Sequence, residues 1–84
     1  MAKTRKVLDI NEGGKHFVCI RDNEKGVFKL YDLYWGTNKY GYPAEKRELI
    51  DEFFMFSSVL SYLTDFSVKN NWGFLFITKE YLNF

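Results

Sequence analysis

The segment that most limits the fold is a glycine-closed turn between two runs of strand-forming residues. Residues 16–21 and 27–35 are rich in β-branched and aromatic side chains, which favour strands. Between them, residues 22–26 read Asp-Asn-Glu-Lys-Gly, which suits a type I turn closed by a glycine in the left-handed conformation. We therefore predict an antiparallel hairpin here.

A third strand is expected before this hairpin. Residues 6–10 are short and apolar, and residues 11–14, Asn-Glu-Gly-Gly, supply a turn. After the hairpin, residues 36–43 contain two glycines and the only proline, which ends the strand. The first half of the chain thus predicts a three-stranded antiparallel meander followed by a loop.

Beyond Pro43 the apolar residues recur with helical spacing. The pattern i, i+3, i+4, i+7 predicts an amphipathic helix from about Ala44 or Lys46 to about Phe66. Residues 72–78 are again rich in strand formers and predict a fourth strand, which residues 79–84 extend or follow as a tail. The predicted fold is one α+β domain spanning residues 1–84, in the order β-β-β-α-β, with the helix packed on one sheet face.

The predicted pairing divides the sheet into two faces. A turn closed at Gly26 makes Ile20 and Leu30 neighbours, so Val18, Ile20, Phe28 and Leu30 would form the core under Phe53, Phe56, Leu60 and Leu63 of the helix. One helix covers only one face, so an apolar patch is expected on the other, where it would mark a contact site. The residues assigned to that face as a protein interface are Phe17, Arg21, Lys29, Tyr31, Leu33 and Trp35, with Cys19 among them in the strand.

The leading functional hypothesis follows from this aromatic surplus. Aromatic residues form 20% of the 84 residues, which is high for a chain of this size, and interfaces are enriched in Tyr, Trp, Phe and Arg. The sequence therefore predicts a protein-interaction module without catalytic activity, which self-associates as a homo-oligomer or binds a larger protein partner. An accessory or inhibitor protein of a mobile genetic element would belong to this class.

The alternative hypothesis is a small nucleic-acid-binding domain. The net charge is only +1, so nucleic acid would have to be held by a local basic and aromatic patch. Three strands followed by a helix, with the hairpin at residues 15–29, are similar in topology to the small arm-binding domains of transposon integrases, and this resemblance implies a sheet laid on DNA. The residues assigned to this alternative are Lys3, Arg5, Lys6, Arg21, Lys29, Lys39 and Arg47.

No catalytic or metal site is predicted, and no cofactor. His16 is the only histidine and lies beside a turn, while Cys19 lies in mid-strand where burial disfavours a thiolate. The serines of the helix have no accompanying base. The acidic residues Glu45, Glu48, Asp51 and Glu52 are explained by the dipole at the N-terminus of the predicted helix.

The expected location is the cytoplasm, without membrane association. A single cysteine cannot form an internal disulfide, which fits a reducing compartment. The basic N-terminus runs directly into a strand, without the apolar segment of a secretory signal. The longest uncharged apolar stretch, residues 53–64, is well short of the roughly 20 residues that a spanning helix requires.

Overall fold

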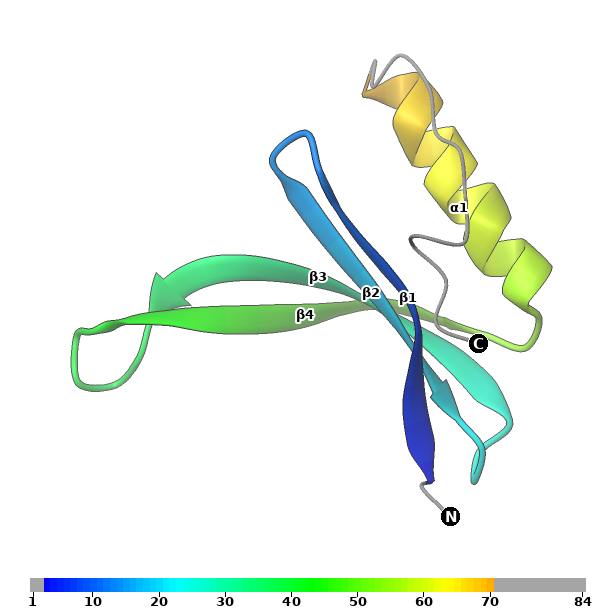
Figure 1. Ribbon diagram of the computed structural model, residues 1–84, viewed down its shortest axis with the longest axis horizontal. Helices are drawn as coiled ribbons and strands as arrows, with labels where there is room; N and C mark the ends of the chain where they lie inside the picture. The colour runs from blue at the N-terminus through cyan, green and yellow to red at the C-terminus, as the bar shows by residue number, and fades with distance from the viewer. Residues whose placement is uncertain (1–2, 71–84) are drawn as a thin grey trace.

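Residues 3–70 form a four-stranded antiparallel sheet followed by one helix. The computed structural model describes residues 3–70 (Figure 1). The strands β1 (Thr4–Glu12), β2 (Lys15–Asp22), β3 (Val27–Thr37) and β4 (Pro43–Phe53) pair in the order β1-β2-β3-β4, and α1 (Phe56–Lys69) comes last. Each strand therefore pairs with its neighbour in sequence, and the sheet is a simple meander.

The predicted order β-β-β-α-β is wrong, because Pro43–Phe53 is a strand and the helix begins only at Phe56. The pairing of β3 with β4 shifts between Leu30 and Tyr31, which face Asp51 and Leu49, so Ile50 is an extra, bulged residue. Leu49 and the bulged Ile50 are adjacent in the sequence, and together with Phe53 they match the spacing of apolar residues along a helix. The predicted fourth strand, residues 72–78, lies outside the described residues.

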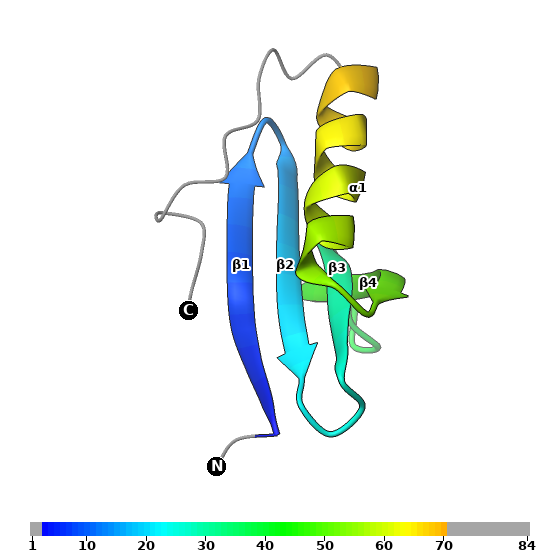
Figure 2. The same cartoon turned by 90° about the vertical axis from the view of Figure 1, so that its right-hand side faces the viewer.

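The core lies between α1 and one face of the sheet. Val59 and Leu63 of the helix are fully buried there, and Figure 2 shows α1 lying along one side of the sheet. Aromatic contacts extend the core, with ring centroids 5.0 Å apart for Phe17 and Phe66 and 5.4 Å apart for Phe28 and Phe56. The sheet side of the core consists of Val7, Leu8, Ile10, Phe17, Cys19 and Leu30.

The register of the central hairpin differs from the predicted one by one residue. Leu30 pairs with Cys19, and Ile20 pairs with Lys29. Because side chains alternate between faces, this difference transfers a whole strand to the other side of the sheet. The helix covers the face with Phe17, Cys19, Phe28 and Leu30, so the predicted core face was wrong for Val18 and Ile20, which lie on the opposite face.

The turn between β2 and β3 is held by Asp22. Its Oδ1 accepts the backbone N–H groups of Glu24 and Lys25 at 3.0 and 3.1 Å, and its Oδ2 lies 3.5 Å from Lys29 Nζ. Gly26 donates its N–H to the Asp22 carbonyl at 2.8 Å and has φ of 70°, which favours glycine. The bonds from Lys25, Lys29 and Glu24 together hold the pKa of Asp22 below its ordinary value, against the opposing effect of burial.

This lowered pKa predicts a stability that falls in acid. A carboxylate with a folded-state pKa below its unfolded value stabilises the fold above about pH 3.9, and that contribution is lost as the pH falls through the folded-state pKa. We therefore expect Asp22→Asn, which keeps an oxygen acceptor but removes the charge, to lose less stability than the wild type between pH 5 and pH 2. Urea unfolding at several pH values measures this difference.

The matched control for this prediction is Asp65→Asn, which removes one carboxylate from the exposed side of α1. Its stability should follow the same pH dependence as the wild type. A wild-type curve parallel to that of Asp22→Asn would contradict the assignment.

Candidate functional site

The most prominent feature of the surface is a projecting hairpin. Pairing of β2 with β3 ends at His16 and Leu33, whereas pairing of β3 with β4 continues to Thr37 and Pro43. Residues 34–46, here called the arm, therefore extend past β2 as two strands only, and Figure 1 shows them leading away from α1.

The tip of the arm is closed by Asn38. Its side-chain Oδ1 accepts the N–H groups of Tyr40 and Tyr42 at 2.9 and 3.0 Å, and its own N–H donates to the Tyr42 carbonyl at 2.9 Å. Gly41 has φ of 84° and donates its N–H to the Asn38 carbonyl. These bonds define a conformation for the tip, although the arm has no covering layer.

The arm exposes four large aromatic side chains. Trp35 is 75% exposed, and Tyr34, Tyr40 and Tyr42 are also exposed. A two-stranded ribbon alone buries little apolar surface, so these side chains have no core to enter. Exposed aromatic side chains gathered on one projection form the kind of surface that marks a contact site.

The sheet face away from α1 continues the surface of the arm. We call it the open face, and on it β3 and β4 place Tyr31 beside Leu49, Leu33 beside Arg47 and Trp35 beside Glu45. The side chains of β2 on the same face include Val18 and Ile20. The open face is defined by Val18, Ile20, Lys29, Tyr31, Leu33, Trp35, Glu45, Arg47, Leu49 and Glu52.

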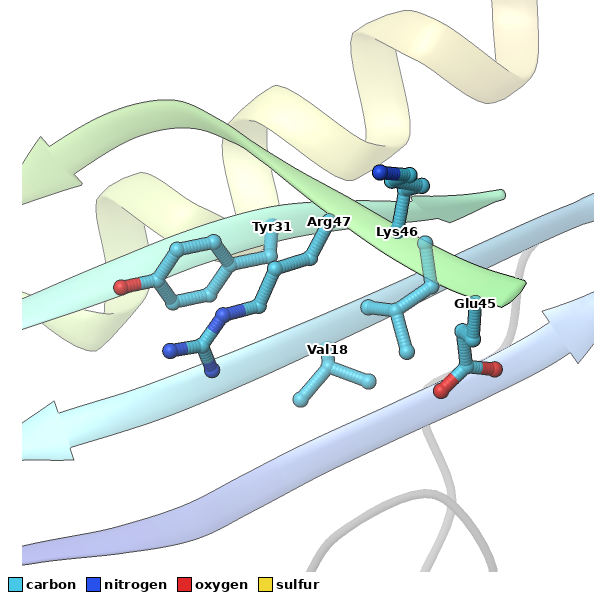
Figure 3. Close-up of a pocket in the computed structure, with 6 residues that line it drawn as sticks. Val18, Tyr31, Glu45, Lys46 and Arg47 are labelled. Carbon is cyan, nitrogen blue, oxygen red and sulfur yellow. The ribbon is translucent and has the colours of Figure 1, made fainter. Parts of the chain in front are cut away.

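A pocket of about 290 Å³ lies on the open face. Its apolar wall includes the buried Val18 together with Tyr31 and Leu33. Figure 3 shows Arg47 against Tyr31, and the guanidinium carbon lies 4.7 Å from the centre of the ring. Glu45 points to the same side of β4 as Arg47, so the pocket has a carboxylate and a guanidinium on its rim.

The structure separates the residues predicted as the protein interface. Tyr31, Leu33 and Trp35 lie together with Lys29 on the open face. Phe17 lies in the core instead, and Arg21 is on the helix side, with its guanidinium carbon 4.6 Å from the centre of the Phe28 ring. The prediction that these six residues form one surface therefore fails for Phe17 and Arg21 because of the one-residue register difference.

Several surface residues of the site were not predicted as part of a protein interface. Tyr34, Tyr40, Tyr42 and Leu49 are exposed, and Glu45 faces the pocket beside Arg47. Residues 44–48 read Ala-Glu-Lys-Arg-Glu, in which apolar and polar residues do not alternate, so no periodic signal marks this part of β4 as a strand.

The basic residues assigned to nucleic-acid binding are dispersed, and several are paired with carboxylates. Lys3 lies 3.6 Å from Glu24, and Lys6 lies 3.0 Å from Asp9. Lys29 lies between Asp22 and Glu52 at 3.5 and 3.8 Å. The remaining four lie at separate places: Arg5 at an exposed position of β1, Arg21 on the helix side, Lys39 over Tyr40 at the arm tip and Arg47 on the open face.

The candidate catalytic residues are placed apart. His16 Nε2 lies 2.7 Å from Asp9 Oδ1 on the open side of the sheet, whereas Cys19 is buried on the helix side. Burial raises the pKa of the Cys19 thiol to about 12, which disfavours a thiolate. Burial also acts to raise the pKa of Asp9, but hydrogen bonds from Lys6 and His16 outweigh it and hold that pKa below its ordinary value.

Among residues 3–70, no cluster of three or more His, Cys, Asp or Glu side chains is placed to hold a metal ion. The acidic residues Glu45, Glu48, Asp51 and Glu52 lie on β4 rather than at the N-terminus of a helix, so the predicted dipole explanation for them was wrong. Glu45 and Glu52 share the open face, and Glu48 and Asp51 face the helix side.

Comparison with known proteins gives no assignment. No protein-family model matches the chain, and searches of curated proteins and of solved structures returned no significant match. Over residues 3–70, no helix has the length and apolar character needed to cross a membrane.

Proposed function

We propose that this protein is a non-catalytic interaction module that binds a protein partner through the arm and the adjoining open face. The observation that carries the proposal is the exposure of Trp35 on an arm whose tip has a defined, hydrogen-bonded conformation. Aromatic anchors supply much of the energy at protein interfaces, especially where they are held in place before binding.

The charges near the arm favour a protein over nucleic acid. On the open side of the sheet, Lys6, Lys29 and Arg47 are accompanied by the carboxylates of Asp9, Asp22, Glu45 and Glu52. A surface that tracks phosphates needs an excess of cations, because affinity comes from neutralising the backbone. Exposed aromatic side chains beside an arginine are instead among the residue types that are enriched at protein interfaces. A cytoplasmic location agrees with the one free thiol, Cys19.

The proposal predicts a specific effect for Trp35→Ala. We expect the variant to fold like the wild type, because the side chain is exposed, and to bind the partner about 30-fold more weakly, or about 2 kcal/mol. The protein is immobilised, partners are captured from cells of its source at 0.5 M salt, and affinity is then measured with the purified partner. At that ionic strength a Debye length of about 4 Å screens exposed charge contacts.

The matched control is Phe54→Ala, which removes another exposed aromatic side chain, 81% exposed, in the segment between β4 and α1. It should leave binding unchanged. Equal binding by wild type and Trp35→Ala would refute the proposal. So would a ligand that is released well below 0.5 M salt and displaced by nucleic acid, since that result would select the alternative function.

A further inference from the structure

The outer edge of β4 is regular over seven residues. Asn38 donates to Tyr42 across the arm, so the even-numbered residues of this part of β4 bond to β3. The odd-numbered residues Pro43, Glu45, Arg47 and Leu49 consequently direct their backbone carbonyls away from β3, and all of them except Pro43, which has no N–H, also direct an N–H there. The pairing shows no irregularity from Pro43 to Leu49, and the bulge at Ile50 ends this stretch.

Two opposite charges stand one pleat apart along this edge. Glu45 and Arg47 both point to the open face, as Figure 3 shows, and neither forms an ion pair with another residue of the described chain. Within residues 3–70, the Arg47 guanidinium lies over the uncharged ring of Tyr31 rather than beside a carboxylate. Charged side chains on an edge strand usually discourage pairing with another chain. An acid at position i and a base at i+2 are nevertheless complementary in a two-fold pair of this strand. When the axis passes through residue i+1, the acid of each copy faces the base of the other.

We propose that a second copy of this chain pairs with the β4 edge, antiparallel, about a two-fold axis that passes through Lys46. In this register Glu45 of each copy faces Arg47 of the other on the open side, and Pro43 faces Leu49. Leu49 is 47% exposed in the single chain, so it has apolar surface to bury there. Because of the two-fold symmetry, each of these two pairs occurs twice in the dimer.

The residue on the axis fits this arrangement. Two Lys46 side chains would meet on the helix side, where like charges are unfavourable. The Lys46 stem instead lies over Gly36 of β3, its Cγ 3.0 Å from the position that a Cβ at Gly36 would occupy. The side chain thus leans toward β3 and away from the edge, which reduces the repulsion between the two ammonium groups.

Charge also selects the register. An axis through Arg47 would set the two Arg47 side chains against each other, and an axis through Glu48 would do the same with Glu48. The pairing uses the β4 edge rather than Trp35, so it goes beyond the proposed partner contact and is tested separately. It would join two sheets into one and place both open faces on the same side.

The test is a charge-reversal series followed by sedimentation equilibrium. The joined edge is small beside a standard interface of about 1,600 Å², so we expect a weak wild-type dimer and measure up to about 1 mM. Glu45→Arg and Arg47→Glu should each weaken the dimer at least about tenfold, because each sets like charges in apposition twice. A one-to-one mixture of these two variants should form a heterodimer, and the double exchange E45R/R47E should dimerise like the wild type.

Two controls carry the same charge changes elsewhere. Asp65→Arg on α1 and Lys25→Glu in the β2–β3 turn are exposed positions outside the β4 edge, and both variants should dimerise like the wild type. A wild type that stays monomeric at 1 mM overturns the proposal. Single variants that dimerise normally, or a mixture that fails to, overturn it as well. None of these outcomes bears on the binding effect of Trp35→Ala, so the two proposals fail independently.

A disulfide test checks the axis itself. In this register the two copies of residue 46 form a pair without mutual backbone bonds, with Cα atoms about 4.5 Å apart, which is within disulfide range. Mild oxidation should therefore cross-link Lys46→Cys into a dimer. Glu48→Cys should stay monomeric, because its two copies would stand about 14 Å apart along the strands. The buried Cys19 does not compete. No cross-link at position 46, or equal cross-linking at position 48, overturns the register.

Discussion

Replacing Leu63 with alanine should lower the free energy of unfolding by about 2–5 kcal/mol. Leu63 is fully buried and lies with Val59 in the only helical surface that faces the sheet within the described chain. Truncation would open a cavity between the two layers, and a thin core has little freedom to close it. Since small domains are stable by only about 5–15 kcal/mol, the loss should be plain in urea unfolding.

Leu60→Ala provides the matched comparison. The sequence predicted Leu60 in the core beside Leu63, but the structure leaves it only half-buried at the rim. We therefore expect a smaller loss from Leu60→Ala than from Leu63→Ala, because less apolar surface leaves the core. Equal losses would mean that α1 is rotated toward Leu60 about its own axis.

The strands that have strong turn signals could be predicted from sequence. The predicted strands at residues 6–10, 16–21 and 27–35 correspond to β1, β2 and β3. Each is bounded by residues with a local reason to turn: Gly13 and Gly14 have positive φ, and Asp22 bonds to the turn before Gly26. Local chemistry of this kind does not depend on the rest of the fold.

The strand β4 was predicted as part of a helix because the residues around its bulge have the apolar spacing of a helix. Leu49, Ile50 and Phe53 fit helical spacing, yet Leu49 lies on the open face, Ile50 is the bulged residue and Phe53 lies on the helix side. The pairing with β3 decides the conformation, and a single sequence does not show that pairing. Apolar spacing alone therefore cannot separate a bulged strand from the first turns of a helix.

The candidate site was predicted in part for a similar reason. Tyr31, Leu33 and Trp35 belong to one strand, so their alternation places them on one face whatever the register. Phe17 and Arg21 belong to β2, and their face relative to β3 depends on the hairpin register. A shift of one residue moved both to the helix side.

The position of Phe17 on the helix side of the sheet predicts a second large loss of stability. Phe17 is 1% exposed, and its ring meets Phe66 of α1 edge to face at 5.0 Å. Phe17→Ala should therefore lower the free energy of unfolding by about 3–5 kcal/mol, through the lost burial and the cavity beside the helix. If the variant is too unstable to purify, Phe17→Leu removes less volume and should show a smaller loss in the same direction.

Trp35→Ala is the control for this experiment, because the sequence predicted Phe17 and Trp35 to lie on the same exposed face. Trp35 is exposed on the arm, so its truncation should change the free energy of unfolding by no more than about 0.5 kcal/mol. Urea unfolding of the two variants, followed by circular dichroism, separates the two placements directly. Similar small losses from both variants would mean that Phe17 is exposed, and that Ile20 rather than Cys19 pairs with Leu30. A large loss confined to Phe17→Ala is the result that the observed register predicts, because in it Phe17 faces α1 while Trp35 lies on the arm.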